Sequence, residues 1–374
     1  MKKLLMVVNE DRFFLSHRKE IALAAHKAGW EVTVVCKDTG RRHEVTAMGL
    51  NVVELPINPT GMNLTQELMT WWFLYALYVK NREAVVHHVG LKIVLWGGLA
   101  ARFARVRGVV NAVSGLGTMF SGDKIGMTAK GILALMRLSN RKKGVKVIFQ
   151  NQEDRDLFLQ HGVIEESQAV FIKGSGVDLN DFRYVPEPES EKLRVVFAAR
   201  MVREKGVMEV IEAADLLRQN YEGKLEFWLC GRLAVNADAV SQEVLESRCD
   251  GKYIRWLGFQ RDIRSVLEQC HIVVFPSYYR EGVPKSLIDA CAVGRPIVTT
   301  CSIGCKDVVD DGVNGLLIPV RDSMALAQKL RILADDKELR VRMGRAARMK
   351  AEREFAIEEV IAKHMELYFE LLTT

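Results

Sequence analysis

The chain alternates short apolar runs with longer stretches in which apolar residues are spaced three or four apart. In the first half, the apolar runs lie at residues 4–8, 31–36, 49–57, 84–89, 109–117 and 144–151. Short runs rich in β-branched residues and bounded by turn residues are typical of buried parallel strands. The stretch at residues 10–29 has helical spacing and ends at a glycine, which predicts a helix. This alternation predicts a doubly wound α/β domain.

The second half repeats the pattern. Its apolar runs lie at residues 194–200, 224–232, 253–263, 271–275 and 296–300. An Asn-Gly pair at residues 314–315 predicts a hairpin-like element over residues 312–319, and residues 346–372 read as one final helix. Residues 184–193 carry two prolines and several acids without periodicity, so they predict a linker. A length of 374 residues also favours two domains.

The stretch at residues 271–300 reads as strand, loop, helix, turn and strand. Pro284 suits the first helical position because it has no N–H to leave unpaired. The free N–H groups of Lys285, Ser286 and Leu287 then form an anion site at the helix N-terminus. Glu281 precedes that site and Asp289 follows it, which suits a sugar nucleotide: N–H groups for phosphates and carboxylates for hydroxyls. The alternative is that both are ordinary surface carboxylates.

This stretch resembles the E-x7-E signature of retaining glycosyltransferases of family 4. The matching residues are Glu281, Gly282, Val283, Pro284, Ile288, Asp289, Ala290, Gly294, Pro296, Ile297 and Val298. The departure is Asp289, which stands where the family has a second Glu. The resemblance implies the GT-B fold, in which two Rossmann-like doubly wound domains face a cleft. The expected domains are residues 1–183, with a returning C-terminal helix at 353–374, and residues 194–352.

The resemblance also implies donor-site roles in the second domain. Arg200 and Lys205 resemble the family's G-R-L-x-x-x-K-G element, with Ala199 in place of its Gly, and would neutralise the donor diphosphate. Glu281 would orient the sugar. Phe259, in the "LG" turn at residues 257–260, would pack on the nucleobase, although a core aromatic is an alternative. Asp289 would hold the ribose. The expected donor-binding set is Gly282, Val283, Lys285, Ser286, Leu287, Asp289, Phe259 and Gly231.

In the first domain, no G-x-G-x-x-G follows the first strand, so a dinucleotide fingerprint is absent. The loop instead carries Ser16, His17 and Arg18, and the family's corresponding loop lies near the donor or acceptor. At the carboxyl ends of later strands we expect His87, His88, Ser114 and Gly115. We take Ser16, His17, Arg18, His88, Ser114 and Gly115 as candidate acceptor contacts. A solvated helix start and a structurally satisfied histidine are the alternatives.

Composition limits which cellular compartment and which classes of binding partner the sequence predicts. The net charge of +6 fits a phosphate, a nucleotide or an anionic membrane without requiring nucleic acid. Seven cysteines without a CxxC pair indicate reduced thiols in a cytosol. The apolar core at residues 4–8 is too short for a signal peptide, and the uncharged run at residues 68–79 is too short to cross a bilayer. We therefore expect a cytoplasmic protein, peripheral on the inner face of the plasma membrane.

Residues 124–146 combine cations with apolar side chains and contain no acid. A basic helix with an apolar face is typical of an interfacial element. The candidate membrane contacts are Lys130, Arg137, Arg141, Lys142 and Lys143, and the aromatic run at residues 71–78 is a second apolar candidate. The alternative is that both helices only cover the sheet.

Four segments, residues 113–120, 175–182, 203–214 and 230–240, resemble the subgroup that extends undecaprenyl-diphosphate-linked glycans. The resemblance thus implies a retaining, metal-independent hexosyltransferase that needs no cofactor. It would move GalNAc or another HexNAc from a UDP-sugar to an undecaprenyl-diphosphate-linked sugar in bacterial polysaccharide biosynthesis or protein glycosylation. A nucleotide-sugar 2-epimerase of the same fold and a non-enzymatic nucleotide-binding regulator remain alternatives. A glycoside hydrolase also uses two carboxylates, but it has no need of the anion site.

Overall fold

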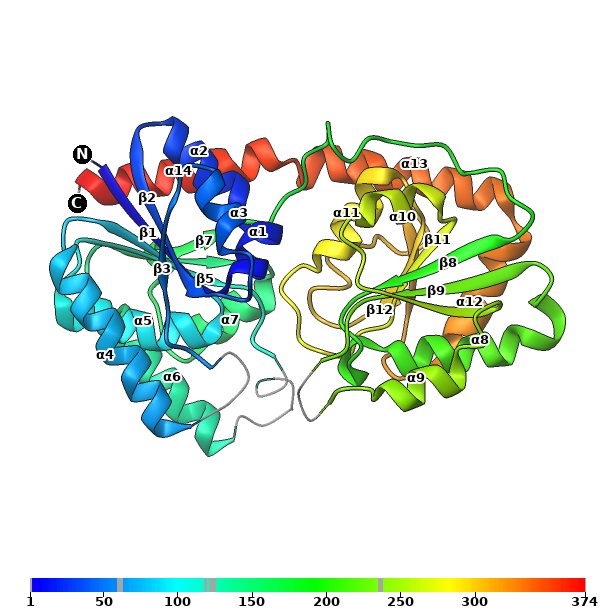
Figure 1. Cartoon of the computed structure of the whole chain (residues 1–374), viewed down its shortest axis with the longest axis horizontal. Coiled ribbons are helices and arrows are strands. Elements are labelled where there is room, and N and C mark those ends of the chain that lie inside the picture. Colours follow the sequence, from blue (N-terminus) through cyan, green and yellow to red (C-terminus); the bar gives the residue numbers. More distant parts are fainter. Residues whose placement is uncertain (1, 59–62, 118–119, 121–125, 235–237, 374) are drawn as a thin grey trace. The chain divides into compact units, whose positions relative to one another are not determined.

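The computed structural model describes residues 2–58, 63–117, 120, 126–234 and 238–373 (Figure 1). The chain forms two compact units, Met1–Gly176 with Ile357–Thr374, and Val177–Ala356. Each unit is built around a parallel sheet with its own buried core. The two doubly wound sheets predicted from the apolar runs are confirmed.

The sheet of the first unit has seven strands in the order β3-β2-β1-β4-β5-β6-β7, all parallel. Their bounds are β1 Lys2–Glu10, β2 Trp30–Lys37, β3 Asn51–Glu54, β4 Val85–Val89, β5 Gly108–Val113, β6 Val145–Phe149 and β7 Ala169–Phe171. Successive residues of β1 enter different cores. Leu4 and Met6 belong to one cluster, and Leu5 and Val7 to the other. Both faces of this central strand are therefore buried, which explains its continuous apolar sequence.

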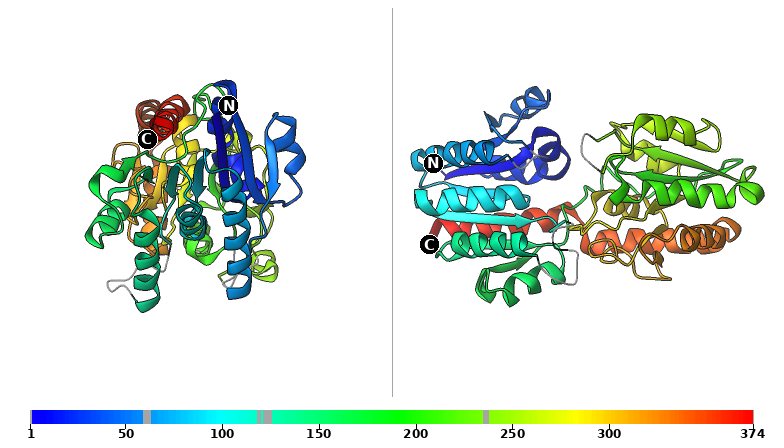
Figure 2. Two further views of the ribbon diagram at one scale, coloured as in Figure 1. Left: turned by 90° about the vertical axis from the view of Figure 1, so that its left-hand side faces the viewer. Right: turned by 90° about the horizontal axis from the view of Figure 1, so that it is seen from below.

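Helices cover both faces of this sheet (Figure 1). On one face α4 Leu64–Lys80, α5 Leu91–Ala104 and α6 Met127–Asn140 pack in sequence against one another. On the other lie α1 Asp11–His17, α2 Lys19–Lys27 and the C-terminal α14 Ile357–Thr373. Lys2 Nζ lies 4.5 Å from the centre of the Phe369 ring, so the two chain ends meet in this unit (Figure 2). The remaining helices are α3 Arg42–Ala47 and α7 Gln152–Gln160.

The sheet of the second unit has the order β10-β9-β8-β11-β12-β13. Its strands are β8 Leu193–Ala198, β9 Leu225–Cys230, β10 Ile254–Gly258, β11 Ile272–Phe275, β12 Ile297–Thr300 and β13 Gly315–Ile318. The hairpin predicted at residues 312–319 is wrong, because β13 is an edge strand that pairs in parallel with β12. The Asn314 side chain is buried and bonds the main chain of Asp310 and Val308 at 2.7 and 3.0 Å. It therefore stabilises the incoming loop.

The helices of this unit are α8 Val207–Tyr221, α9 Gln242–Arg248, α10 Ile263–Gln269, α11 Lys285–Val293, α12 Ser323–Asp335 and α13 Lys337–Glu354. The single final helix predicted at residues 346–372 is instead two helices, because α13 ends at Glu354 and α14 begins at Ile357. At the break between the two helices, the N–H of Val177 donates to the main-chain oxygen of Phe355 at 2.8 Å. Val177 also forms an isolated parallel β-bridge with Ala356. The last helix belongs to the first unit, as the resemblance implied.

The division between the units falls at residues 176 and 177, ahead of the linker predicted at 184–193. Buried arginines bind that segment to the second unit. Arg295 donates to the carbonyl oxygen of Val185 at 2.7 Å, and Arg340 forms a two-pronged pair with Glu187 at 2.9 and 2.7 Å. The composition of the segment is that of a linker, but its carbonyls and Glu187 satisfy arginines more than 100 positions away.

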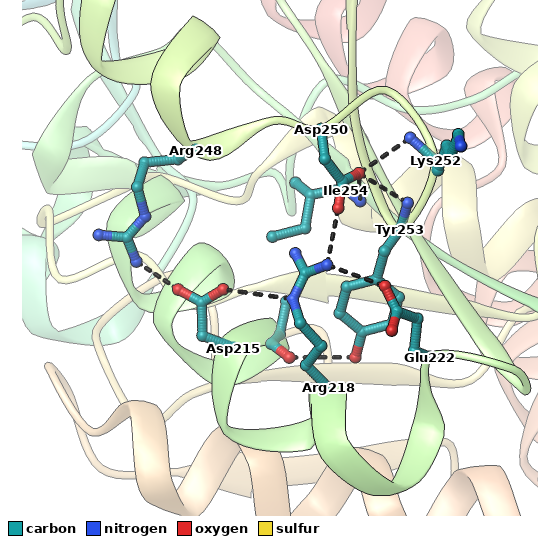
Figure 3. Close-up of polar contacts among 9 residues, drawn as sticks. Asp215, Arg218, Glu222, Arg248, Asp250, Lys252, Tyr253 and Ile254 are labelled. Atoms are coloured by element: carbon teal, nitrogen blue, oxygen red, sulfur yellow. Dashed lines mark hydrogen bonds and ion pairs between the residues drawn. The ribbon is translucent and has the colours of Figure 1, made fainter.

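A polar network fixes the start of β10, the strand that leads to Phe259 (Figure 3). The Asp250 carboxylate accepts the N–H groups of Lys252, Tyr253 and Ile254 at 2.9, 2.8 and 3.1 Å. Arg218, on α8, donates to the same carboxylate at 2.7 Å. Although burial opposes it, these bonds hold the pKa of Asp250 well below its usual range. The turn before β10 is thereby tied to α8.

Candidate active site

The loop between β11 and α11 carries the signature carboxylates. Helix α11 begins at Lys285, and Pro284 is its N-cap instead of its first helical residue. The N–H groups of Leu287 and Ile288 donate to Pro284 O at 3.1 and 3.2 Å. Leu287 N–H is thus not available to a ligand, contrary to the sequence prediction. No main-chain acceptor among the described residues takes the N–H of Lys285 or Ser286, so these two groups remain the candidates for an anion contact at the helix N-terminus.

Glu281 is ion-paired with Lys205, which lies at the end of the short 3-10 helix Arg203–Lys205 between β8 and α8. The pair joins two loops that are 76 residues apart in the sequence. Both side chains are largely buried, and the Lys205 ammonium lies 5.0 Å from the centre of the Tyr279 ring and 5.6 Å from that of Phe275. The structure therefore brings together the residues that the resemblance assigned to two adjacent parts of the donor, Lys205 to the diphosphate and Glu281 to the sugar.

The surroundings of this pair are poor in water. Burial and the nearby Glu281 charge raise the pKa of Tyr279 to about 12. Burial and Asp238 likewise raise the pKa of Glu204, the neighbour of Lys205. Arg200 lies in the same loop and is exposed. Charges in such surroundings interact more strongly than charges in bulk water.

Asp289, the departure from the family signature, points into the packed side of α11. It is buried and pairs with Lys285 one turn earlier in the same helix. Burial raises the pKa of the Asp289 carboxyl, and Lys285 partly offsets the shift. The predicted ribose contact requires this carboxylate to exchange its lysine partner for a hydroxyl.

Two glycines allow main-chain segments of the site to touch. A Cβ on Gly231, just after β9, would lie 1.7 Å from Ala199 O. A Cβ on Gly304 would lie 1.9 Å from Gly282 O, and the φ of Gly304 is +86°. Glycine at these positions lets the loop after β12 press against the Glu281 loop. Gly231 thus has a packing role, and its donor contact remains a prediction.

Phe259 follows β10 and is 51% exposed. The alternative of a core aromatic is therefore wrong. The Arg232 guanidinium lies 4.4 Å from the centre of the Phe259 ring. Aromatic rings and guanidinium groups are both groups on which bases stack, and base binding at Phe259 remains a prediction.

The candidates in the first unit divide into exposed and buried groups. Ser16 and His17 lie at the C-terminal end of α1, where their side chains are 2.7 Å apart. Arg18 is only 3% exposed and lies beside His364 and Tyr368 of α14. Burial lowers the pKa of Arg18 to about 10, and Tyr368 of α14 partly opposes the shift. In this conformation Arg18 is neither a solvated residue at a helix start nor open to contact with a phosphate.

The histidines of β4 lie inside the sheet. His88 is completely buried; its Nδ1 lies 2.7 Å from Asn111 Oδ1 and its Nε2 lies 2.8 Å from Tyr78 OH. His87 faces the opposite side, where its Nδ1 lies 2.6 Å from Tyr368 OH. His88 thus has the structurally satisfied environment of the alternative reading. Ser114 and Gly115 follow β5 and are partly exposed, so their acceptor role stays a prediction.

Sequence reasoning missed several residues that organise these loops. Asp11, buried at the end of β1, accepts the N–H groups of Thr39 and Arg41 at 2.9 Å each. Burial alone would raise the pKa of Asp11, but these bonds and the Thr39 hydroxyl lower it. Ser277, directly after the Phe275-Pro276 pair, touches Glu281 itself. An acid or hydroxyl at the carboxyl end of a parallel strand is the signal that identifies such positions.

Comparison with known families decides the class. The Glycosyl transferases group 1 model matches residues 180–350, and the Glycosyl transferase 4-like model matches residues 3–151. The chain is a glycosyltransferase of the GT-B fold. The two matched segments correspond to the two units of the structure.

Among curated relatives, this glycosyltransferase is 27% identical over 360 residues to N,N'-diacetylbacillosaminyl-diphospho-undecaprenol alpha-1,3-N-acetylgalactosaminyltransferase of Campylobacter jejuni, covering 90% of this chain and 93% of the relative. It is 22% identical to UDP-Gal:alpha-D-GlcNAc-diphosphoundecaprenol alpha-1,3-galactosyltransferase of Escherichia coli, covering 92% and 90%. Among solved structures, HepE of Anabaena in complex with UDP and glucose superposes with a TM-score of 0.77 at 18% identity, covering 98% and 99%. The structural likeness supports the fold.

Proposed function

We propose that this glycosyltransferase moves a sugar, GalNAc or another HexNAc, from a UDP-sugar to a sugar linked to undecaprenyl diphosphate. The observation that carries the proposal is the Lys205–Glu281 pair next to the N-terminus of α11. Lys205 supplies a cation and the start of α11 supplies N–H groups for a diphosphate. Glu281 supplies a carboxylate for sugar hydroxyls. Both relatives described above act, by their names, on undecaprenyl-diphosphate-linked sugars.

The transfer proceeds with retention of configuration. The acceptor hydroxyl attacks the anomeric carbon on the face from which the diphosphate leaves, and the leaving phosphate oxygen takes the hydroxyl proton. Negative charge then builds on the diphosphate, where Arg200, Lys205 and the N–H groups of Lys285 and Ser286 stabilise it. Glu281 orients the sugar, and Asp289 binds the ribose. The cations replace a metal ion in this scheme, so neither metal nor organic cofactor takes part.

The test is a screen of UDP-sugars against a synthetic polyprenyl-diphosphate-linked HexNAc, with both UDP release and the lipid product measured. Transfer of one UDP-HexNAc, with an α-linkage by NMR, is the expected result. UDP release that does not depend on the acceptor, or conversion of the donor to its 2-epimer, would contradict the proposal. UDP binding without turnover of any donor would indicate a nucleotide-binding regulator.

We further propose that the first unit docks peripherally on the cytoplasmic face of the membrane through α4 and α6. Exposed on α6 are Met127, Leu135 and Leu138, with Lys130, Arg137, Arg141 and Lys143 exposed on or beside that helix. No helix among the described residues is long and apolar enough to cross a bilayer. An exposed helix with apolar and basic residues is suited to an anionic leaflet. Lys124, at the start of the predicted basic stretch, lies outside the described residues.

Helix α4 adds a second exposed apolar surface. Its residues Leu64, Leu68, Met69 and Trp72 are exposed, Trp72 by 60%. The neighbouring Trp71 packs edge-on against Phe103 of α5, with 6.1 Å between the ring centres. The predicted aromatic run contributes only in part, because Tyr78 is buried against His88. Lys142 is likewise tied to the main chain of Val106, and burial beside Arg102 lowers its pKa. Arg141 and Lys143 are therefore better probes of docking than Lys142.

Docking is tested with the double variant Arg141→Glu/Lys143→Glu and with Trp72→Ser. The matched control is Arg342→Glu/Arg345→Glu, which changes the same charge on exposed positions of α13. Each cation near an anionic leaflet contributes about 1 kcal/mol, so two reversals lower binding to phosphatidylglycerol vesicles by at least about 30-fold. Equal vesicle binding by parent, docking variants and control would rule out this surface.

A further inference from the structure

Ser277 is a buried residue at the centre of the loops that carry Lys205 and Glu281. It lies two positions after β11 and has no exposed surface. Its main-chain oxygen accepts the Ser302 hydroxyl at 2.9 Å and also the Thr300 hydroxyl, both from the end of β12 and the loop after it. The residue is therefore fixed from behind by the neighbouring strand.

The Ser277 hydroxyl oxygen faces three groups. It lies 3.0 Å from Glu281 Oε1 and 3.0 Å from the main-chain oxygen of Glu204, and it accepts the N–H of Tyr279 at 3.2 Å. A hydroxyl carries one proton, so it donates fully to only one of the two acceptors at a time. A bond to a charged carboxylate is the stronger of the two. Lys205 contacts the same Oε1 of Glu281, so Ser277 and Lys205 together fix this carboxylate.

We propose that Ser277 is a positioning residue for glycosyl transfer, which holds the Glu281 carboxylate at the orientation needed for the donor sugar. Through the carbonyl of Glu204, the same hydroxyl ties the Lys205 loop to the Glu281 loop. The inference rests on the role proposed for Glu281. The hydroxyl of Ser277 bonds the Glu281 carboxylate, whereas the Lys205 ammonium keeps its own bond to that carboxylate, so we expect removal of the hydroxyl to affect sugar transfer more than the affinity for UDP.

The test compares Ser277→Ala with Ser277→Thr, which keeps the hydroxyl. Thr299→Val is the matched control. The Thr299 hydroxyl is also buried, but it donates to the main-chain oxygen of Phe275, at 2.6 Å, and not to Glu281. Loss of a hydrogen bond to a charged group predicts a fall of about 10-fold to 100-fold in kcat for Ser277→Ala. The Kd for UDP stays within about twofold of the parent value, and Ser277→Thr recovers part of the activity.

A double-mutant cycle separates positioning from a general structural role. In a Glu281→Gln background, Ser277→Ala is expected to cost less than about twofold more, because both changes remove one interaction. An equal cost in both backgrounds would overturn the inference. If the Ser277→Ala variant is fully active while the Glu281→Gln variant is inactive, the inference is also overturned, but the proposed function is not. Full activity of Glu281→Gln would instead overturn the role proposed for Glu281.

A measurement that needs no substrate completes the test. A crystal structure of the Ser277→Ala variant is expected to show the Glu281 carboxylate moved away from its position beside Lys205. An unchanged carboxylate would contradict the inference even if the donor sugar proved to be different. Absence of transfer from every UDP-sugar by the parent protein would count against the proposed function alone.

Discussion

Acid should destabilise the first unit through its buried histidines. Burial lowers the pKa of His88 to about 4 and that of His364, on α14, to about 3. His87 shifts in the same direction, because of burial and of the charges of His364 and Arg18. At a pH between these folded-state pKa values and the ordinary histidine pKa of about 6.5, the unfolded chain binds more protons than the folded chain. The free energy of unfolding therefore falls as the pH drops below about 6.5.

The size of the effect follows from these values. A histidine whose pKa is about 4 in the fold and about 6.5 in the unfolded chain lowers the free energy of unfolding by about 2 kcal/mol between pH 7 and pH 5. His364 adds a similar amount, so the two together cost about 4 kcal/mol. That is a large part of the total stability of a typical domain, which is about 5–15 kcal/mol.

The assay is urea unfolding at pH 5, 6 and 7, followed by tryptophan fluorescence and by hydrogen exchange of the α14 peptides. The variant His364→Leu removes one titrating group and should lose about 2 kcal/mol less than the parent between pH 7 and pH 5. His161→Leu, at an exposed position after α7, is the control and should follow the parent. Equal stability of the parent at pH 5 and pH 7, or an unchanged loss in His364→Leu, would refute the reasoning.

Further predictions concern the proposed donor site and its support. Arg200→Ala and Lys205→Ala are each expected to lower turnover by about 10²- to 10³-fold. Arg200→Ala should not change the melting temperature, whereas Lys205→Ala should lower it, because Glu281 is left buried without its cation; activity within threefold of the parent would contradict the diphosphate assignment. Transfer should continue in EDTA, and loss that magnesium or manganese restores would disprove metal independence. Asp289→Ala should raise the KM for the donor and Asp289→Glu should be tolerated, with a 2'-deoxyribose donor as the check on a ribose contact. Asp250→Ala should lower the free energy of unfolding by about 1–3 kcal/mol, because three N–H groups lose their acceptor and Arg218 loses one of its carboxylate partners, and Glu338→Ala, at an exposed position of α13, is the control.

The parallel strands were predictable from the sequence because each is buried on both faces and therefore reads as a continuous apolar run. Strand β7, Ala169–Phe171, was missed because it is three residues long and lies at the sheet edge. The hairpin at residues 312–319 was predicted wrongly for a related reason. An Asn-Gly pair indicates a turn, but it does not reveal that the Asn314 side chain is buried in a loop that enters from a neighbouring strand.

The candidate site shows a similar limit, set by sequence distance. Signature residues on one strand–loop–helix segment were predictable because spacing and Gly/Pro positions determine their local geometry. The burial of Arg18 was not, since the helix that lies beside it begins 339 positions later, at Ile357. The partner of His87 is likewise 281 residues away, at Tyr368. No local pattern reports such contacts, so the sequence assigned to the surface a cation that lies in the interior.

Both signature carboxylates are ion-paired with lysines. Glu281 pairs with Lys205 and Asp289 pairs with Lys285, so Lys205, one of the two cations expected to bind a diphosphate, already has a carboxylate partner. Arg200 is exposed and forms no ion pair within the described part of the chain. We therefore expect Arg200 to meet the diphosphate first, and Lys205 to exchange its carboxylate for a phosphate oxygen afterwards. That exchange releases Glu281 for the sugar hydroxyls while the Ser277 hydroxyl still fixes its carboxylate, so one ion pair links capture of the diphosphate to orientation of the sugar.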